Sequence, residues 1–136
     1  MKDFITTYTI VEPIIKEIIP AICELFSNSK ESEKIITNLK NIAQLTKCIG
    51  HEIENGSICE CRLTEIDKYI AMVNNMLYLT NKKLYKLNRR KLKTKKKVKL
   101  IEVYNDLLIQ LCMLNNVLSL TYQAGNRVLL EIDNEK

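Results

Sequence analysis

The amino-acid sequence predicts an all-α protein, an antiparallel up-down four-helix bundle whose first helix is kinked. Apolar residues recur with helical spacing in four successive segments, as expected for helices that each bury one face. The chain has only three glycines and two prolines, too few for a turn-rich β-sandwich. Its 136 residues, 46% of them hydrophobic, suffice for one core. Residues 1–136 are therefore expected to form a single helical-bundle domain.

The first helix is expected at approximately 3–27. Its apolar residues, among them Ile14 and Ile18, fall on one broad stripe. Pro13 can open a helical piece, because an N–H group in a first turn has no intrahelical partner. Pro20 removes a hydrogen bond from the helix interior, so this second proline predicts the kink.

The second helix is expected at approximately 29–54. Asn28 followed by Glu31 has the spacing of an N-terminal cap with a reciprocal acidic partner. Asn55 and Gly56 follow the apolar pattern, and a glycine in this position is a common stop signal. Short connections are therefore expected on both sides of this helix.

The third helix is expected at approximately 64–90. Thr64 and Asp67 fit the Ser/Thr-x-x-Asp/Glu capping box, which predicts the first turn. The apolar spacing is regular as far as Leu87. Beyond that residue the sequence becomes strongly basic and the helical period is lost.

The fourth helix is expected at approximately 97–125, either stopping at Gly125 or continuing through Ile132. A continuous helix over 65–125 would be about 90 Å long at 1.5 Å per residue, too long for one small domain to bury. Its adjacent basic residues would also repel one another. A turn near 88–94 is therefore expected. The alternative is an elongated, dimeric helical assembly that uses the whole 65–125 region.

Charge is distributed very unevenly along the chain. The 21 basic and 16 acidic residues give a formal charge of +5, but no acidic residue lies between Asp67 and Glu102. Twelve basic residues fall in that interval, which leaves a formal charge of −7 on the remainder. Such a basic segment attracts polyanions. The predicted anionic-ligand-binding residues are Lys82, Lys83, Lys86, Arg89, Arg90, Lys91, Lys93, Lys95, Lys96, Lys97 and Lys99.

An anionic phospholipid membrane surface is the favoured partner of this basic segment. Lysine outnumbers arginine in it, which suits a diffuse anionic surface better than a planar bidentate site. Leu84, Leu87 and Leu92 fit a membrane interface, where apolar side chains enter the headgroup region and lysine stems snorkel.

Nucleic acid or an acidic protein is the alternative partner. Tyr85 is the only aromatic residue within the basic segment for base stacking, and no known nucleic-acid-reading motif is present. A face that merely keeps the protein soluble is the third interpretation, although such faces normally mix both signs of charge.

Cys48, His51, Cys59 and Cys61 form a second set of candidate residues. Four soft ligands within 14 residues could hold a tetrahedral Zn²⁺, although the spacing is not that of a paired zinc knuckle. In the competing interpretation Cys48 packs on an apolar face and the other three are loop residues, with Cys59 and Cys61 open to oxidation. We favour this second interpretation and expect no cofactor.

The cysteines also bear on the cellular compartment. Their number is odd, and Cys23, Cys48 and Cys112 fall in apolar periodic stretches, where a free cysteine behaves as a small hydrophobe. The first residues lack the pattern of a secretory signal peptide. These observations predict a reducing, cytoplasmic location. Peripheral membrane association is expected from the basic segment and not from the cysteines.

An enzyme is not expected. The three glycines form no phosphate-binding GxGxxG or GxxxxGK[ST] loop, and the single histidine, His51, has no plausible triad partner. The longest uncharged run, 107–126, contains five Asn or Gln residues that would be costly in hydrocarbon. This run is expected to be a buried bundle helix and not a membrane span.

The layout resembles the amino-terminal four-helix bundles of mixed-lineage-kinase-like pseudokinases and the related HeLo-like cell-death and plant resistance-protein bundles. The resemblance is architectural and covers residues 3 to about 125. It rests on an apolar first helix, a second helix with an internal Cys48, and a third helix that leads into the basic segment 82–99. It implies a cell-death or signalling effector that binds anionic lipids through the basic segment, homo-oligomerises and permeabilises membranes.

Overall fold

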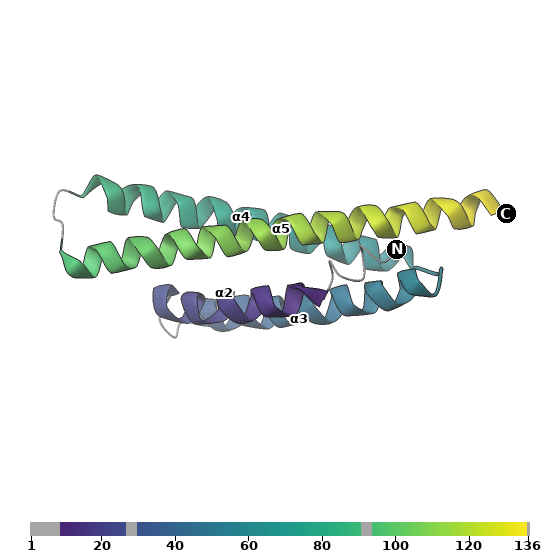
Figure 1. The fold of residues 1–136 in the computed structure, drawn as a ribbon, viewed down its shortest axis with the longest axis horizontal. Helices are drawn as coiled ribbons and strands as arrows, with labels where there is room; N and C mark the ends of the chain where they lie inside the picture. The colour runs from purple at the N-terminus through teal and green to yellow at the C-terminus, as the bar shows by residue number, and fades with distance from the viewer. Residues whose placement is uncertain (1–8, 27–29, 91–93, 136) are drawn as a thin grey trace.

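The computed structural model describes residues 9–26, 30–90 and 94–135. These residues form four α-helices: α2 (Val11–Phe26), α3 (Lys30–Glu54), α4 (Glu60–Arg89) and α5 (Lys95–Glu135). The expected all-α, four-helix fold class is confirmed. Figure 1 shows α4 and α5 side by side as a long pair, with α2 and α3 packed along one side of it.

The core lies where all four helices overlap. Both α3 and α5 contact the three other helices. Burying one of their Leu or Ile side chains contributes about 1.5–3 kcal/mol, so this overlap region holds most of the packing energy. The side chains that are at most 1% exposed include Ile18, Ile22, Leu39, Ile42, Ile49, Ile66, Leu107, Leu111, Leu114 and Leu118.

The first helix, α2, contains both prolines. Pro13 lies in its first turn, where the missing N–H removes no intrahelical hydrogen bond, and Pro20 lies inside the helix. Residues 3–8 and 27 of the expected helix lie outside the described residues. The kink at Pro20 remains a prediction.

The end of α3 follows the predicted stop signal. Gly56 has a φ of +69°, which glycine adopts without the steric cost that a Cβ would bring. The Gly56 N–H donates to the Ile53 carbonyl oxygen at 3.0 Å, and the Ser57 N–H donates to the Glu52 carbonyl oxygen at 3.0 Å. These two bonds form a Schellman motif. Asn28, the expected N-terminal cap, lies outside the described residues.

The start of α4 differs from the prediction. The helix begins at Glu60 and not at residue 64, with Cys59 as the N-cap residue. Thr64 therefore lies one turn inside the helix, where its hydroxyl donates to the Glu60 carbonyl oxygen at 3.4 Å. The capping box predicted at Thr64 is wrong. The extra turn is stabilised by burial of Leu63, which is only 4% exposed.

Gly125 does not end the fourth helix, which runs on to Glu135. A Cβ at Gly125 would lie 2.6 Å from Leu63 Cδ2 and 2.7 Å from Ile58 Cδ1. The glycine is therefore a close-approach residue that lets the beginning of α4 pack against α5. Beyond it, Val128 continues the buried face. The expected end at residue 125 is therefore wrong, and the alternative of a helix that continues through Ile132 is confirmed.

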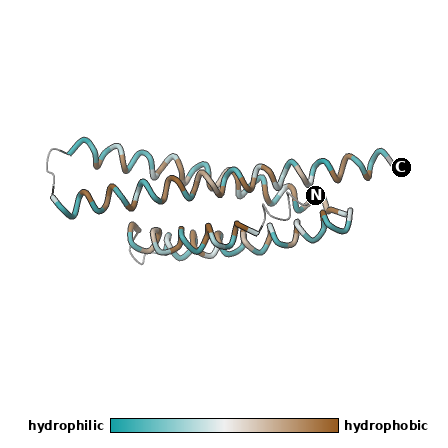
Figure 2. Tube along the Cα trace, in the orientation of Figure 1, coloured by the Kyte–Doolittle hydropathy of each residue, from teal (hydrophilic) through white to brown (hydrophobic). Residues whose placement is uncertain are grey.

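The helix is interrupted between Arg89, where α4 ends, and Lys95, where α5 begins, as predicted for residues 88–94; residues 91–93 lie outside the described part of the chain. Thr94 caps α5, because its hydroxyl accepts the Lys97 backbone N–H at 3.2 Å and its carbonyl accepts the Val98 N–H at 3.1 Å. A single continuous helix over 65–125 is therefore not formed, whereas the alternative of a dimeric assembly that uses this region stays a prediction. Figure 2 shows that this end of the helix pair is hydrophilic, whereas hydrophobic residues recur along the central stretch.

The uncharged run 107–126 lies within α5. Four of its leucines, including Leu111 and Leu118, are buried in the core, as expected for a bundle helix. Among the residues that the structure describes, no helix has the length and apolar character needed to cross a membrane.

Candidate anionic-ligand surface

The predicted binding residues gather at one end of the molecule. We define the basic hairpin as residues 82–99, which comprise the end of α4, the turn and the beginning of α5. Figure 1 shows that this end of the α4–α5 pair projects beyond α2 and α3. Of the eleven predicted residues, Lys91 and Lys93 lie outside the described residues. Eight of the other nine are exposed, and Lys97 is partly buried.

A thin apolar seam orients these cations outward. Leu84 is 8% exposed, and Leu87 and Leu100 are partly buried. Because these leucines face the partner helix, the basic residues between them are turned to the helix faces that meet solvent. The spacing of leucines and basic residues therefore determines which helix faces carry the positive charge, in addition to how much charge is present.

The basic hairpin has no acidic counterpart in the described residues. The ion pairs among the described residues join Lys16 to Glu12, His51 to Glu54 and Arg62 to Glu52. All three pairs lie outside the hairpin. Neighbouring cations with no internal counter-ion repel one another over the screening distance of about 10 Å at 0.1 M salt. An external polyanion would relieve that repulsion.

Two of the lysines make internal contacts that shape the hairpin. The Lys83 Nζ lies 3.9 Å from the centroid of the Phe26 ring, a cation–π contact that ties α4 to α2. The Lys97 Nζ donates to the Arg90 carbonyl oxygen across the turn. These two side chains therefore position the hairpin, and the exposed cations around them are the ones offered to a ligand.

A hollow of about 270 Å³ opens between the two arms of the hairpin. The Tyr104 phenol has an ordinary pKa of about 10 and is a protonated hydrogen-bond donor at neutral pH. Burial raises this pKa further. Cationic and hydroxyl donors at the mouth of one hollow can hold an anionic group. The lining residues are Lys83, Lys86, Leu87 and Arg90 from α4, with Leu100 and Tyr104 from α5.

A second exposed tyrosine, Tyr78, was not predicted from the sequence. Tyr78 is 64% exposed and Tyr85 is 63% exposed, two helical turns apart on α4. Both line a hollow of about 350 Å³, together with Lys82. Tyr78 precedes the basic segment in the sequence. The one sequence signal that could have revealed it is its seven-residue spacing from Tyr85, which places the two rings on the same side of a helix.

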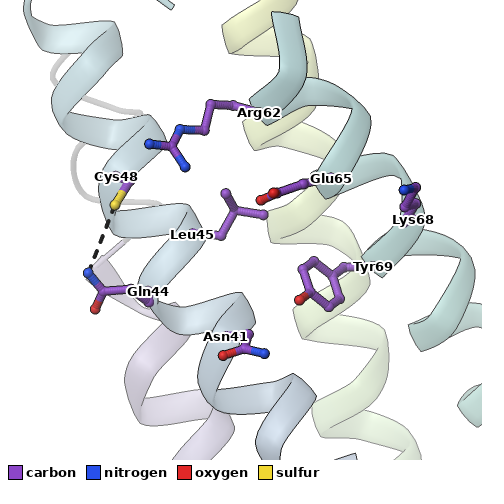
Figure 3. Close-up of a pocket in the computed structure, with 8 residues that line it drawn as sticks. All are labelled: Asn41, Gln44, Leu45, Cys48, Arg62, Glu65, Lys68 and Tyr69. Carbon is purple, nitrogen blue, oxygen red and sulfur yellow. Dashed lines mark hydrogen bonds between the residues drawn. The ribbon is translucent and has the colours of Figure 1, made fainter. Parts of the chain in front are cut away.

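A larger hollow of about 520 Å³ lies between α3 and α4, away from the basic hairpin (Figure 3). Arg62 Nε donates to Glu52 Oε1 at 3.2 Å, and this bond and the carboxylate charge raise the pKa of Arg62. On α3, Gln44 Nε2 donates to Cys48 Sγ at 3.9 Å. An amide is no general base, so this arrangement does not activate the thiol as a nucleophile.

The structure does not assemble the zinc site. Cys59 and Cys61 are joined in a disulfide at the start of α4, whereas Cys48 and His51 lie on α3. Within the described part of the chain, no group of three or more His, Cys, Asp or Glu side chains is placed to hold a metal ion. The four candidate ligands are therefore not gathered in this structure, in which Cys59 and Cys61 pair with each other. Zinc binding stays a hypothesis.

The remaining cysteines also depart from expectation. Cys23 and Cys112 are exposed, although the apolar periodicity around them predicted packing, and Cys48 is intermediate. Each exposed thiol lies on the outer side of a helix whose opposite side carries the core. The expected reducing compartment remains a prediction.

No protein-family model, curated protein or solved structure matches this chain. The resemblance to cell-death four-helix bundles is therefore still a hypothesis. The functional argument rests on the charge, exposure and hollows of the basic hairpin.

Proposed function

We propose that this chain is a non-enzymatic helical-bundle module that associates with anionic membrane surfaces through its basic hairpin. One observation carries the proposal: eight exposed cations project at one end of the molecule, without an acidic partner in the described residues. Each basic residue held near an anionic leaflet contributes roughly 1 kcal/mol, so a handful of them supports recruitment.

Apolar and aromatic side chains among the cations add to this argument. Val98, between Lys97 and Lys99, is 49% exposed, and Tyr85 is exposed on the other arm. Such residues enter the headgroup region of a bilayer while the lysine stems extend toward the phosphates. The hairpin end would therefore contact the membrane first, with the four-helix core held away from it.

The test is sedimentation with vesicles that contain phosphatidylserine, at low and high salt, with phosphatidylcholine vesicles as the uncharged control. The hairpin variant replaces six exposed cations by Gln: Lys86, Arg89, Arg90, Lys95, Lys96 and Lys99. It keeps Lys83 and Lys97, which make internal contacts. The matched control replaces six exposed lysines of the body: Lys16, Lys30, Lys34, Lys40, Lys47 and Lys68.

Both variants lower the formal net charge by six, from +5 to −1. Loss of binding in the hairpin variant alone supports the proposal, as does weakening of wild-type binding at high salt. Equal loss in both variants would show that net charge, and not the hairpin, governs binding. Wild-type protein that does not bind phosphatidylserine vesicles at low salt would overturn the proposal.

A cell-death or signalling role is a finer proposal on the same surface. A permeabilising bundle would release a dye trapped inside the anionic vesicles, and the hairpin variant would not. Binding without dye release would leave a peripheral membrane adaptor, which corresponds to the signalling form of the proposal. The two roles are thus distinguished by one additional readout.

Nucleic acid is the second candidate ligand, and Tyr78 with Tyr85 is the observation that favours it. Exposed aromatic rings beside cations can stack on unpaired bases, and each stacked base is worth about 1–3 kcal/mol. Single-stranded RNA and DNA should therefore be titrated at the same salt as the vesicles. Tighter binding to nucleic acid, lost on replacing Tyr78 and Tyr85 by Ala, would favour this candidate over the membrane.

A further inference from the structure

The outer face of α5 carries an uncovered apolar stripe. Ile109 is 57% exposed, Met113 is 42% exposed and Leu120 is 48% exposed. Steps of four and seven residues place these side chains on one side of a helix. The core leucines of α5, such as Leu111 and Leu118, occupy the opposite side. The stripe is therefore left over after the four-helix core is complete.

No charged side chain interrupts this stripe. The residues from 107 to 126 are all uncharged, with Asn116 as the exposed polar residue between Met113 and Leu120. Exposed charges lie at the two ends, where Glu102 and Asp106 precede the stripe and Arg127 follows it. A solvent-facing helix side normally mixes both signs of charge. An exposed apolar stripe with a charged rim is typical of an interaction surface.

The charges at the two ends make the face complementary to itself. In an antiparallel pair with a two-fold axis between Leu114 and Asn115, Ile109 lies opposite Leu120 of the second copy. In the same register Glu102 lies opposite Arg127 of the second copy, since both pairs are equidistant from the axis. A parallel pair would instead place Glu102 against Glu102 and both basic hairpins side by side.

We infer that this face of α5 binds a second copy of the chain, in an antiparallel pair related by a two-fold axis. A two-fold axis repeats each contact, so the Ile109–Leu120 contact and the Glu102–Arg127 contact both occur twice in the dimer. The pair directs the two basic hairpins to opposite ends of the assembly. This inference does not depend on what the hairpin binds.

The test is a charge-swap cycle read by sedimentation equilibrium over a range of concentrations. We expect wild-type protein to dimerise. Glu102→Arg or Arg127→Glu alone should raise the dissociation constant of the dimer about tenfold, because each substitution creates two like-charge contacts. A tenfold change corresponds to about 1.4 kcal/mol. The double variant carrying both changes should restore the wild-type dissociation constant. A monomeric wild type, or a double variant weaker than either single one, would overturn the inference.

A second pair of variants tests the apolar stripe itself. Replacing both Ile109 and Leu120 by Lys should give a monomer with unchanged helix content, because both side chains are exposed. The matched control replaces Tyr78 and Leu79, exposed on α4, by Lys. This control should still dimerise. Dimers that survive the α5 substitutions, or that the α4 substitutions also dissociate, would contradict the assigned surface.

Discussion

The part of the α4–α5 pair that α2 and α3 cover differs from the part that forms the basic hairpin. Where α2 and α3 cover the pair, Leu111, Leu114 and Leu118 are completely buried. In the basic hairpin, Leu84 is the only buried side chain of the described residues 82–90 and 94–99. The same two helices therefore form a packed core along one part of their length and a charged, thinly packed projection along another.

This difference shows how one small chain keeps a dense positive charge apart from its packed core. Cations crowded against the core would weaken it, because unpaired charges are costly to bury. On the projecting hairpin they remain hydrated, and only the local helix pair bears their mutual repulsion.

The largest expected effect separates the two regions directly. Leu118→Ala should lower the free energy of unfolding by about 2–5 kcal/mol, because it leaves a cavity in the core. Leu87→Ala in the hairpin should cost much less, since that side chain is only partly buried. Urea denaturation of both variants measures the difference. Equal losses would show that the hairpin is part of the same tightly packed unit.

A smaller effect is expected where α4 meets the far end of α5. Gly125→Val should destabilise the protein by about 1–3 kcal/mol, because its side chain would overlap Leu63 and Ile58. Asn126→Val, at the next and exposed position, is the control. A Val at 125 that is tolerated as well as one at 126 would mean that the two helices are not in close contact there.

The smallest effect concerns Tyr104 in the hairpin hollow. Burial raises the pKa of its phenol, so the folded state holds the proton more tightly than the unfolded state. The resulting stability is complete below the unfolded pKa of about 10 and is lost as the pH rises through the folded pKa. Tyr104→Phe should therefore lose less stability than the wild type on alkaline titration. Identical alkaline profiles would contradict burial of this group.

The fold was largely predictable from sequence because its main determinants are local. Apolar spacing identified four helices, Gly56 identified the end of α3, and the dense charge identified the turn before α5. The errors arose where distant residues meet. Gly125 looked like a stop signal, and only its approach to Leu63 shows why a glycine lies inside the helix.

The candidate site was predictable in charge but not in shape. A stretch without acidic residues is visible in the sequence, so all nine described cations of the hairpin had been identified. The hollow that includes Tyr104 depends on how α4 and α5 pair, and Tyr78 lay outside the segment that the charge defined. Closeness in sequence also did not gather the four candidate zinc ligands, because Cys48 and His51 lie on α3 whereas Cys59 and Cys61 pair at the start of α4.

Lysine footprinting on vesicles tests the separation of core and binding end most directly. Wild-type protein is acetylated with and without phosphatidylserine vesicles, and the modification of each lysine is measured by mass spectrometry. We expect strong protection of Lys82, Lys86, Lys95, Lys96 and Lys99, and little change at Lys16, Lys34, Lys40 and Lys47, which are equally exposed without vesicles. Uniform protection of both groups, or protection of the body lysines alone, would contradict the account.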